Sequence, residues 1–186
     1  MTLQTNRLKL EELSLKELDT IHSLHSLPQT DEFNTLGIPE SLHVTETLLI
    51  DWIDQQKATP RTSYIFPIKL IETSQFVGLI ALIIGKPKYK IAEVWYKIHP
   101  NHWRQGYATE ALTKLLEFGF LNLGLHRIEA GSAIENIASI KVLEKVGMKR
   151  EGIKRKILPL GEKWIDNYFY SILETDFEQK IKNPTD

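Results

Sequence analysis

Apolar residues repeat with two different periods along the chain, and the first period is helical. Between residues 14 and 27, leucine and isoleucine recur every three or four positions behind Ser14 and Glu17, which stand at capping-box spacing. This spacing predicts a helix. Residues 41–56 have the same amphipathic pattern and predict a second helix, while the Asp-, Asn-, Gly- and Pro-containing residues 31–40 predict a loop between the two.

From residue 63 onward the apolar runs become short and rich in β-branched residues, which is typical of strands. Residues 63–72 and 75–85 predict two neighbouring strands. Pro67 indicates an edge or a bulge in the first of them, because proline cannot donate to a strand ladder. Residues 91–100 predict a third strand.

Helices and strands alternate in the rest of the chain. In order, the sequence predicts a helix over 108–124, a strand over 126–133, a helix over 136–147 and two strands within 150–173. Asn136 and Gly147 cap the second of these helices, and the last two strands are joined through the segment Pro159–Gly161. Helices first, then strands, then alternation favour a single α/β domain over residues 1–186, with one mixed sheet between helices.

Composition narrows the classes of function. The 23 basic and 24 acidic residues nearly cancel, which argues against a nucleic-acid-binding face or a polybasic membrane anchor. No apolar run approaches the ~20 residues of a membrane span and no secretory signal is present, so we expect a cytoplasmic protein. The absence of cysteine excludes disulfides and a thiol nucleophile. The six histidines form no H-x-x-x-H or H-E-x-x-H pair, and His22 and His25, three apart on a predicted helix, have no carboxylate pair nearby, so no metal is expected.

One segment, "NHWRQGYATEAL" at residues 101–112, points to chemistry. It places Gly106 and Ala108 directly before a predicted helix. Small residues let a ligand approach the backbone, and a helix N-terminus offers free N–H groups and the positive end of a dipole. The segment is therefore a candidate anion site, although it matches neither the P-loop nor the dinucleotide-binding fingerprint. The alternative is a glycine that serves only the local turn.

The segment "AEVWYKIHPNHWRQGYATEAL", followed downstream by "NIASIKVLEKVGMKREG", resembles the GNAT superfamily of acetyl-CoA-dependent N-acetyltransferases. Within it, the sequence is similar to the RimJ/RimL-type branch, which acetylates N-terminal amines of ribosomal proteins. The similarity runs from "TNRLKL" near the start to "GEKWIDNYFYSIL" near the end. It implies the GNAT fold, a central mixed and largely antiparallel twisted sheet flanked by helices.

The resemblance also implies a binding site for acetyl-CoA as co-substrate. In the family, the loop before the helix wraps the pyrophosphate with backbone N–H groups, and the pantetheine arm enters between two strands that diverge. Carried onto this chain, the expected contacts are Lys97, Ile98, Trp103, Arg104, Gln105, Gly106, Tyr107, Ala108, Thr109, Asn136 and Lys145.

Two catalytic residues follow from the same resemblance. Glu93 matches the family's general base, which is needed because an ammonium must lose a proton before it can attack a thioester. A solvated strand carboxylate is the alternative reading of Glu93. Ser139, in the Asn-x-x-Ser pattern, is the candidate acid or hydrogen-bond donor to the departing thiolate. Leu143 stands where many GNAT enzymes have a tyrosine acid. No acidic residue matches a second glutamate proposed as base in the ribosomal enzymes, because Leu158 falls near that position.

The resemblance implies transfer of acetyl to a primary amine by direct attack in a ternary complex. The chain has no cysteine for a cysteine-linked covalent route. A protein N-terminal α-amine is the expected acceptor. Small amines, such as a polyamine or an amino-sugar antibiotic, and a non-catalytic acyl-CoA-binding role are the alternatives. Neither nucleic acid nor membrane is expected as a partner, and a homo-oligomer is left open. The acceptor is not identified by the sequence, because the family builds that pocket from the variable 28–60 region.

Overall fold

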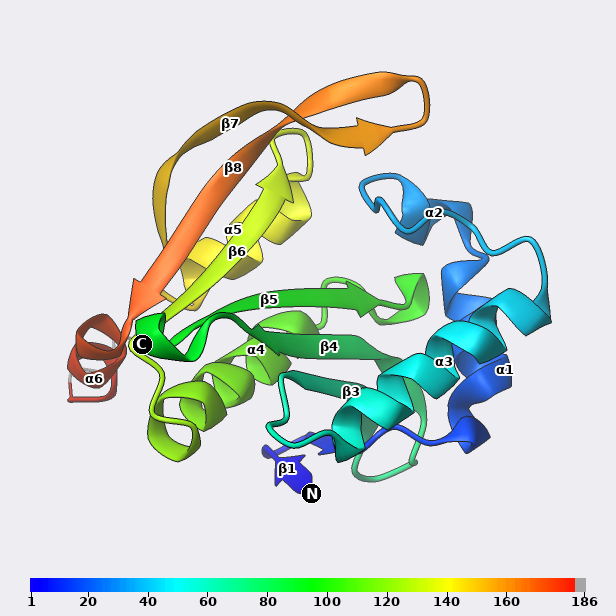
Figure 1. Cartoon of the computed structure of the whole chain (residues 1–186), viewed down its shortest axis with the longest axis horizontal. Coiled ribbons are helices and arrows are strands. Elements are labelled where there is room, and N and C mark those ends of the chain that lie inside the picture. The colour runs from blue at the N-terminus through cyan, green and yellow to red at the C-terminus, as the bar shows by residue number, and fades with distance from the viewer. Residues whose placement is uncertain (183–186) are drawn as a thin grey trace.

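The computed structural model describes residues 1–182, and these residues form one twisted eight-stranded sheet between helices (Figure 1). The strand order is β1-β2-β3-β4-β5-β6-β8-β7, with β5 and β6 parallel and the other neighbours antiparallel. The strands are β1 (Thr2–Gln4), β2 (Leu8–Glu11), β3 (Ser63–Leu70), β4 (Phe76–Ile84), β5 (Ile91–Ile98), β6 (Arg127–Ala133), β7 (Lys149–Leu160) and β8 (Lys163–Leu173). The predicted mixed, largely antiparallel α/β architecture is confirmed.

The helices lie on both faces of this sheet (Figure 1). They are η1 (Leu15–Glu17), α1 (Leu18–His25), α2 (Pro28–Asp31), α3 (Leu42–Lys57), η2 (Pro87–Tyr89), η3 (Pro100–His102), α4 (Tyr107–Glu117), η4 (Phe118–Asn122), α5 (Ile137–Lys145) and α6 (Glu174–Lys182). Within the described residues, no helix has both the length and the apolar composition needed to cross a membrane.

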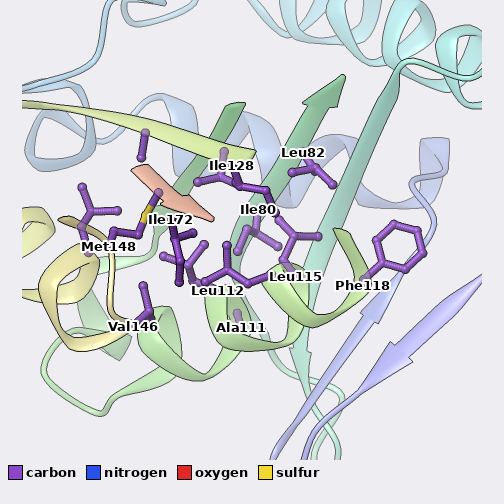
Figure 2. Packing of buried hydrophobic residues seen from close by; sticks show 14 of the residues in the cluster. Ile80, Leu82, Ala111, Leu112, Leu115, Phe118, Ile128, Val146, Met148 and Ile172 are labelled. Carbon is purple, nitrogen blue, oxygen red and sulfur yellow. The ribbon is translucent and has the colours of Figure 1, made fainter. Parts of the chain in front are cut away.

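Two separate apolar clusters fill the two faces, because successive side chains of a strand point to opposite sides. On β4, Ile80 and Leu82 join the larger cluster under α4, whereas Leu79 joins a smaller cluster under α1 and α3. Figure 2 shows the larger cluster, in which Leu112 and Leu115 of α4 meet the side chains of the sheet. Each strand therefore presents one set of side chains to α4 and α5 and the alternate set to α1 and α3.

The first predicted helix is divided in the structure. Ser14 and Glu17 form the expected capping box, but it opens the short helix η1, and α1 follows directly. A short helix that the sequence did not predict, α2, then begins at Pro28. It is separate from α1 because a proline is accommodated at the first position of a helix and not within one.

Pro67 lies inside the sheet, opposite Leu79 of β4. The β2–β3 pairing ends at Leu10 and Ile68, so the proline occupies the part of β3 just beyond its shorter neighbour. A register irregularity follows between Ile68 and Lys69. Pro67 is therefore tolerated because the β2–β3 ladder has already ended beside it, and not because β3 is an outer strand.

The β7–β8 turn falls one residue later than predicted. Pro159 and Leu160 pair with β8 inside the ladder, and the turn is formed by Gly161, with φ +58°, and Glu162. The C-terminal helix α6 was not predicted at all. Its Phe177 is buried in the larger cluster. The end of the domain predicted at residue 186 lies outside the described residues.

Candidate active site

The centre of the sheet is split between its two parallel strands. β5 and β6 pair over Ile91–Glu93 and Arg127–Glu129, where they run side by side. Further along, the two strands diverge (Figure 1). There, among the described residues, β5 remains paired only with β4, and β6 remains paired only with β8. We call this divergence the split. Backbone groups that border the split have lost a neighbouring strand and can pair with a ligand.

The strand register identifies which residues of β5 turn their backbone toward the split. His99 N–H donates to Val77 O at 2.8 Å, which extends the β4–β5 ladder by a hydrogen-bonded pair. Bonded and non-bonded pairs alternate along an antiparallel ladder. The backbone groups of Lys97 are therefore directed at β4, while those of Val94 and Tyr96 are directed into the split. The sequence placed this pairing around Lys97.

Ile98 borders the split as expected, but its carbonyl is already used. Trp103 Nε1 donates to Ile98 O at 2.7 Å, and the backbone N–H of Trp103 donates to Pro100 O at 3.1 Å. Both donors of Trp103 are thus spent within the protein. Its position in the expected binding loop is explained by this anchoring of the loop to the end of β5.

The loop before α4 has the backbone geometry of an anion site. Arg104 and Gly106 have φ of +61° and +79°, so two left-handed residues flank Gln105. Alternation of this kind turns successive N–H groups toward one side. Glu110 N–H makes the first helical hydrogen bond, to Gly106 O at 3.0 Å. The N–H groups of residues 107–109 precede it and have no helical partner.

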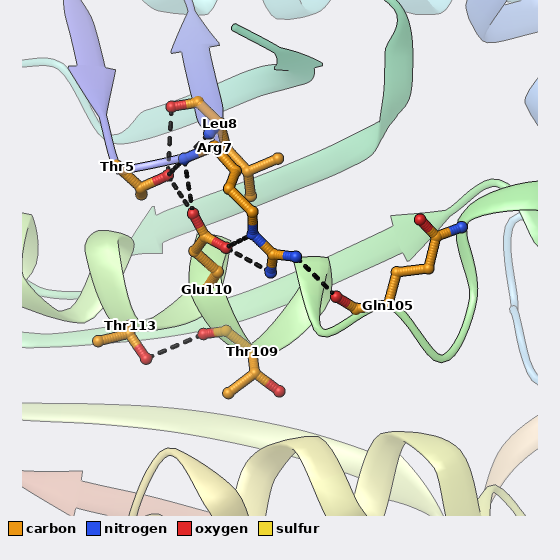
Figure 3. Close-up of polar contacts among 7 residues, drawn as sticks. All are labelled: Thr5, Arg7, Leu8, Gln105, Thr109, Glu110 and Thr113. Carbon is orange, nitrogen blue, oxygen red and sulfur yellow. Dashed lines mark hydrogen bonds and ion pairs between the residues drawn. The ribbon is translucent and has the colours of Figure 1, made fainter. Parts of the chain in front are cut away.

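A clamp from the turn between β1 and β2 holds this loop in place (Figure 3). Arg7 Nη1 donates to Gln105 O at 3.1 Å, and Arg7 Nε and Nη2 both contact Glu110 Oε2, at 2.7 and 2.6 Å. Thr5 Oγ1 donates to Glu110 Oε1 at 2.5 Å, and the Arg7 guanidinium stacks 4.7 Å from the centre of the Tyr107 ring. Burial alone would raise the pKa of Glu110, but the hydrogen bonds from Thr5 and Arg7 hold it below its usual value.

Helix α5 brings a second set of groups to the split from the α4 side. Asn136 caps the helix and its side chain accepts a hydrogen bond from Ser139 N–H at 3.0 Å. Ser139 Oγ lies 2.9 Å from Tyr96 Oη of β5. Burial raises the pKa of Tyr96 to about 12, against the lowering effect of its hydrogen bond with Ser139. The phenol is therefore protonated at neutral pH and can act as a donor.

The opposite face of β5 carries Glu93. Its side chain is exposed. Glu93 is three residues from Tyr96 on β5, so the two side chains lie on opposite faces, and Glu93 shares the α1–α3 side with Trp95. The neighbouring carboxylate on β6, Glu129, is paired with Arg127 Nε at 2.7 Å, and Arg127 also pairs with Glu151. Within residues 1–182 no ion pair involves Glu93, so it is the carboxylate beside the split that is available to a substrate.

Lys145 is set apart from the other predicted residues. It ends α5, about 13 Å along the helix axis from the Asn136 cap. Its carbonyl accepts a hydrogen bond from Lys180 Nζ at 2.8 Å, which ties it to α6. Its role in binding stays a prediction.

Sequence reasoning missed Tyr96, Arg7 and Glu110. Tyr96 stands within a quoted motif, but its contact with Ser139 joins residues 43 positions apart in the chain. Arg7 and Glu110 are 103 positions apart. The sequence could have indicated Tyr96, because it lies three residues after Glu93 on the same strand and alternation places it on the opposite face of the sheet.

Comparison with known proteins agrees with this geometry. The model of the acetyltransferase (GNAT) domain family matches residues 7–149. The uncharacterized N-acetyltransferase YnaD of Bacillus subtilis is 33% identical over 180 residues, which cover 95% of this chain and 99% of that protein.

Two solved structures share the fold. Spermidine N-acetyltransferase from Vibrio cholerae, in complex with CoA and spermine, has a TM-score of 0.83 at 23% identity, covering 94% of this chain and 99% of that one. RimL, a ribosomal-protein alpha-N-acetyltransferase in complex with coenzyme A, has a TM-score of 0.84 at 15% identity, covering 93% and 98%. With its split sheet, its loop before α4 and a family match over most of its length, the chain belongs to the GNAT family of N-acetyltransferases.

Proposed function

We propose that this enzyme acetylates α-amines at protein N-termini, with acetyl-CoA and the acceptor bound together on opposite faces of the split. The observation that carries the proposal is the division of groups between those faces. Ser139 and the loop before α4 lie on one side of the sheet, and Glu93 lies exposed on the other. Two substrates approaching from the two sides would meet between the strands.

The co-substrate side is suited to acetyl-CoA, which supplies the acetyl group as a reactive thioester. The N–H groups of residues 104–109 would hold the pyrophosphate, because Gly106 in the left-handed region leaves the backbone uncovered. The backbone of Val94 and Tyr96 would pair with the pantetheine arm, together with the Asn136 side chain. Structures of the related proteins contain CoA, which supports this assignment.

Ser139 and Tyr96 would act together on the departing sulfur. A serine hydroxyl is a weak acid, but Ser139 Oγ lies 2.9 Å from a protonated phenol. The phenol can donate to Ser139 while Ser139 donates to the thiolate, so charge that develops on sulfur is shared along two hydrogen bonds. This pair would stabilise the departing thiolate in place of the tyrosine acid that many GNAT enzymes have where this chain has Leu143.

Glu93 would accept the proton of the acceptor amine, through water because its side chain is exposed. An α-amine has an unperturbed pKa near 7.7–8.0 and a lysine amine near 10.4, so deprotonating the α-amine at neutral pH costs about 3 kcal/mol less. A site with one exposed carboxylate is therefore better matched to α-amines. RimL carries the description alpha-N-protein acetyltransferase, which supports the same choice.

The test compares two peptides at pH 7, one with a free N-terminus and no lysine, the other with a blocked N-terminus and one lysine. Release of the CoA thiol and the mass of the peptide are measured, with spermidine as a third acceptor. We expect the free N-terminus to react fastest. Faster acetylation of the blocked peptide contradicts the α-amine preference, turnover of spermidine alone assigns a small-molecule enzyme, and no thiol release with any acceptor indicates a non-catalytic CoA-binding protein.

A further inference from the structure

A half-buried lysine, Lys97, lies on the acceptor face of β5, and its Nζ atom is buried. Glu93, Trp95 and Lys97 are alternate residues of the strand and share the face directed at α1 and α3. Trp95 lies 5.8 Å from Trp52 of α3, and Trp52 lies 6.1 Å from His25 of α1, ring centre to ring centre. Lys97 extends the row begun by Glu93 toward the end of β5.

Buried polar atoms without partners lie on Lys97 itself and on the segment of residues 31–34, whose Asp31 carries a charge that acts on the lysine. Lys97 Nζ, Asp31 Oδ1 and Asn34 Nδ2 are buried and make no hydrogen bond with any residue among 1–182. Asp31 is close enough to Lys97 to oppose the lowering of its pKa, and Asn34 N–H donates to Asp31 O at 2.9 Å. The three residues come from the end of α2, the turn after it and β5.

A buried polar atom without a hydrogen-bond partner destabilises the folded protein. A buried donor or acceptor that lacks a partner costs about 1–3 kcal/mol, and a buried charge costs more. The remaining buried, unpartnered atoms in the described chain belong to Arg61 and Ser63, at the start of β3. The unpartnered atoms of Lys97, Asp31 and Asn34 are therefore groups whose missing hydrogen bonds a ligand could supply.

The chemistry of the three atoms selects the ligand. Lys97 and Asn34 offer donors and Asp31 offers an acceptor. An extended peptide presents carbonyls and N–H groups in alternation and can satisfy both kinds. A polyamine presents donors alone and would bring further positive charge to Lys97. Burial lowers the pKa of Lys97 to about 8, while Asp31 opposes this, so the amine still carries charge in most molecules at pH 7.

We propose that Lys97, Asn34 and Asp31 form a subsite for the main chain of the acceptor peptide and select peptides over polyamines. This inference rests on the proposed acetylation of protein N-termini. Lys97 is four residues beyond Glu93 on β5, a separation of about 13 Å at the rise of a strand. A peptide extended along β5 from Glu93 reaches Lys97 at about its fourth residue. A dipeptide ends before the subsite.

The experiment compares Lys97→Met, which keeps length and apolar bulk, with Lys88→Met, an exposed lysine in η2 that serves as control. The acceptors are a lysine-free hexapeptide amide, a dipeptide amide with the same first residues, and spermidine. We expect Lys97→Met to raise the KM of the hexapeptide at least tenfold. The KM values of the dipeptide and of acetyl-CoA should change less than twofold, the KM for spermidine should stay equal or fall, and Lys88→Met should change none of them.

Calorimetry of the hexapeptide with the CoA-bound protein separates this inference from the proposed function. Binding that Lys97→Met weakens tenfold supports the subsite even if no amine is acetylated. A hexapeptide that fails to bind the wild type, binding within threefold in Lys97→Met, or an equal effect on all three acceptors overturns it. Asn34→Ala, on the turn after α2, is the second variant should Lys97→Met fail to fold, and a rise of about threefold in the peptide Kd is expected.

Discussion

Gly106 offers a test of the loop before α4 in which strain and binding can be separated. Its φ of +79° is matched by Gly37, which also has φ +79° but lies in the loop after α2. A Cβ at Gly37 would meet no atom within 4 Å, and a Cβ at Gly106 would approach only the flexible end of Arg7, at 3.4 Å. Alanine at either position therefore carries the same backbone strain, about 1–2 kcal/mol, and little steric penalty.

The two alanine variants should consequently lose similar stability but differ in CoA affinity. A loss of 1–2 kcal/mol lowers the Tm by a few degrees in a chain of this size. The Cβ at residue 106 additionally covers the N–H groups that would meet the pyrophosphate. Loss of one hydrogen bond to a charged group, about 1.5–3 kcal/mol, raises the Kd about 10- to 100-fold.

Isothermal titration of both variants with CoA, together with thermal unfolding, measures the two effects. Gly37→Ala should bind CoA like the wild type despite its lower Tm. A Kd of Gly106→Ala within threefold of the wild type would refute the placement of the pyrophosphate at this loop. Equal weakening in both variants would refute the reasoning as well, because it would trace the loss to general instability.

Three further predictions concern the proposed catalytic groups and a buried histidine. Glu93→Gln should lower kcat roughly 100-fold at pH 7 with the KM for acetyl-CoA unchanged, and the deficit should shrink at high pH; an unchanged rate at pH 7 would make the residue structural. Tyr96→Phe and Ser139→Ala should each lower kcat about tenfold or more, and the double variant should be no slower than Ser139→Ala, whereas additive losses would mean that the two hydroxyls act independently. Burial, with the charges of Lys97 and His22, lowers the pKa of His25 from 6.5 to about 4, so the stability it contributes is complete above pH 6.5 and is lost as pH falls to 4, by up to about 3 kcal/mol. Chemical denaturation at several pH values measures the free energy of unfolding. This free energy should fall between pH 6.5 and 4 in the wild type and in the exposed control His43→Gln but not in His25→Gln. The same fall in all three proteins would contradict the prediction.

Much of the fold could be predicted because its signals are local. The helix α3, the strand pair β3–β4 and the cap of α5 by Asn136 each depend on residues within one element or turn. The predictions that missed were those in which distant partners decide. For Pro67 the sequence predicts an edge or a bulge, and a register irregularity does follow at Ile68 and Lys69. Its place within the sheet depends on the short β2, which the local sequence does not record.

The candidate site divides in the same way. Gly106 and Asn136 are recognisable from the sequence, because a left-handed turn and a helix cap make demands on residue type at one position. The partners of Ser139 and Lys97 depend on strand register and on which helices cover each face of the sheet. A one-residue change in register would exchange the sides of the sheet on which Tyr96 and Lys97 lie.

The clamp between Arg7 and Glu110 makes the start of the chain a thermodynamic partner of the loop before α4. Coupling between two regions is reciprocal: the free energy by which ligand binding at the loop stabilises the β1–β2 turn equals the free energy by which an ordered turn favours ligand binding. CoA that orders the loop should therefore slow amide hydrogen exchange in the β1–β2 turn, some 100 residues earlier in the chain. Conversely, a deletion or fusion that frees Thr5 and Arg7 should be felt first as weaker CoA binding, before the sheet itself is destabilised.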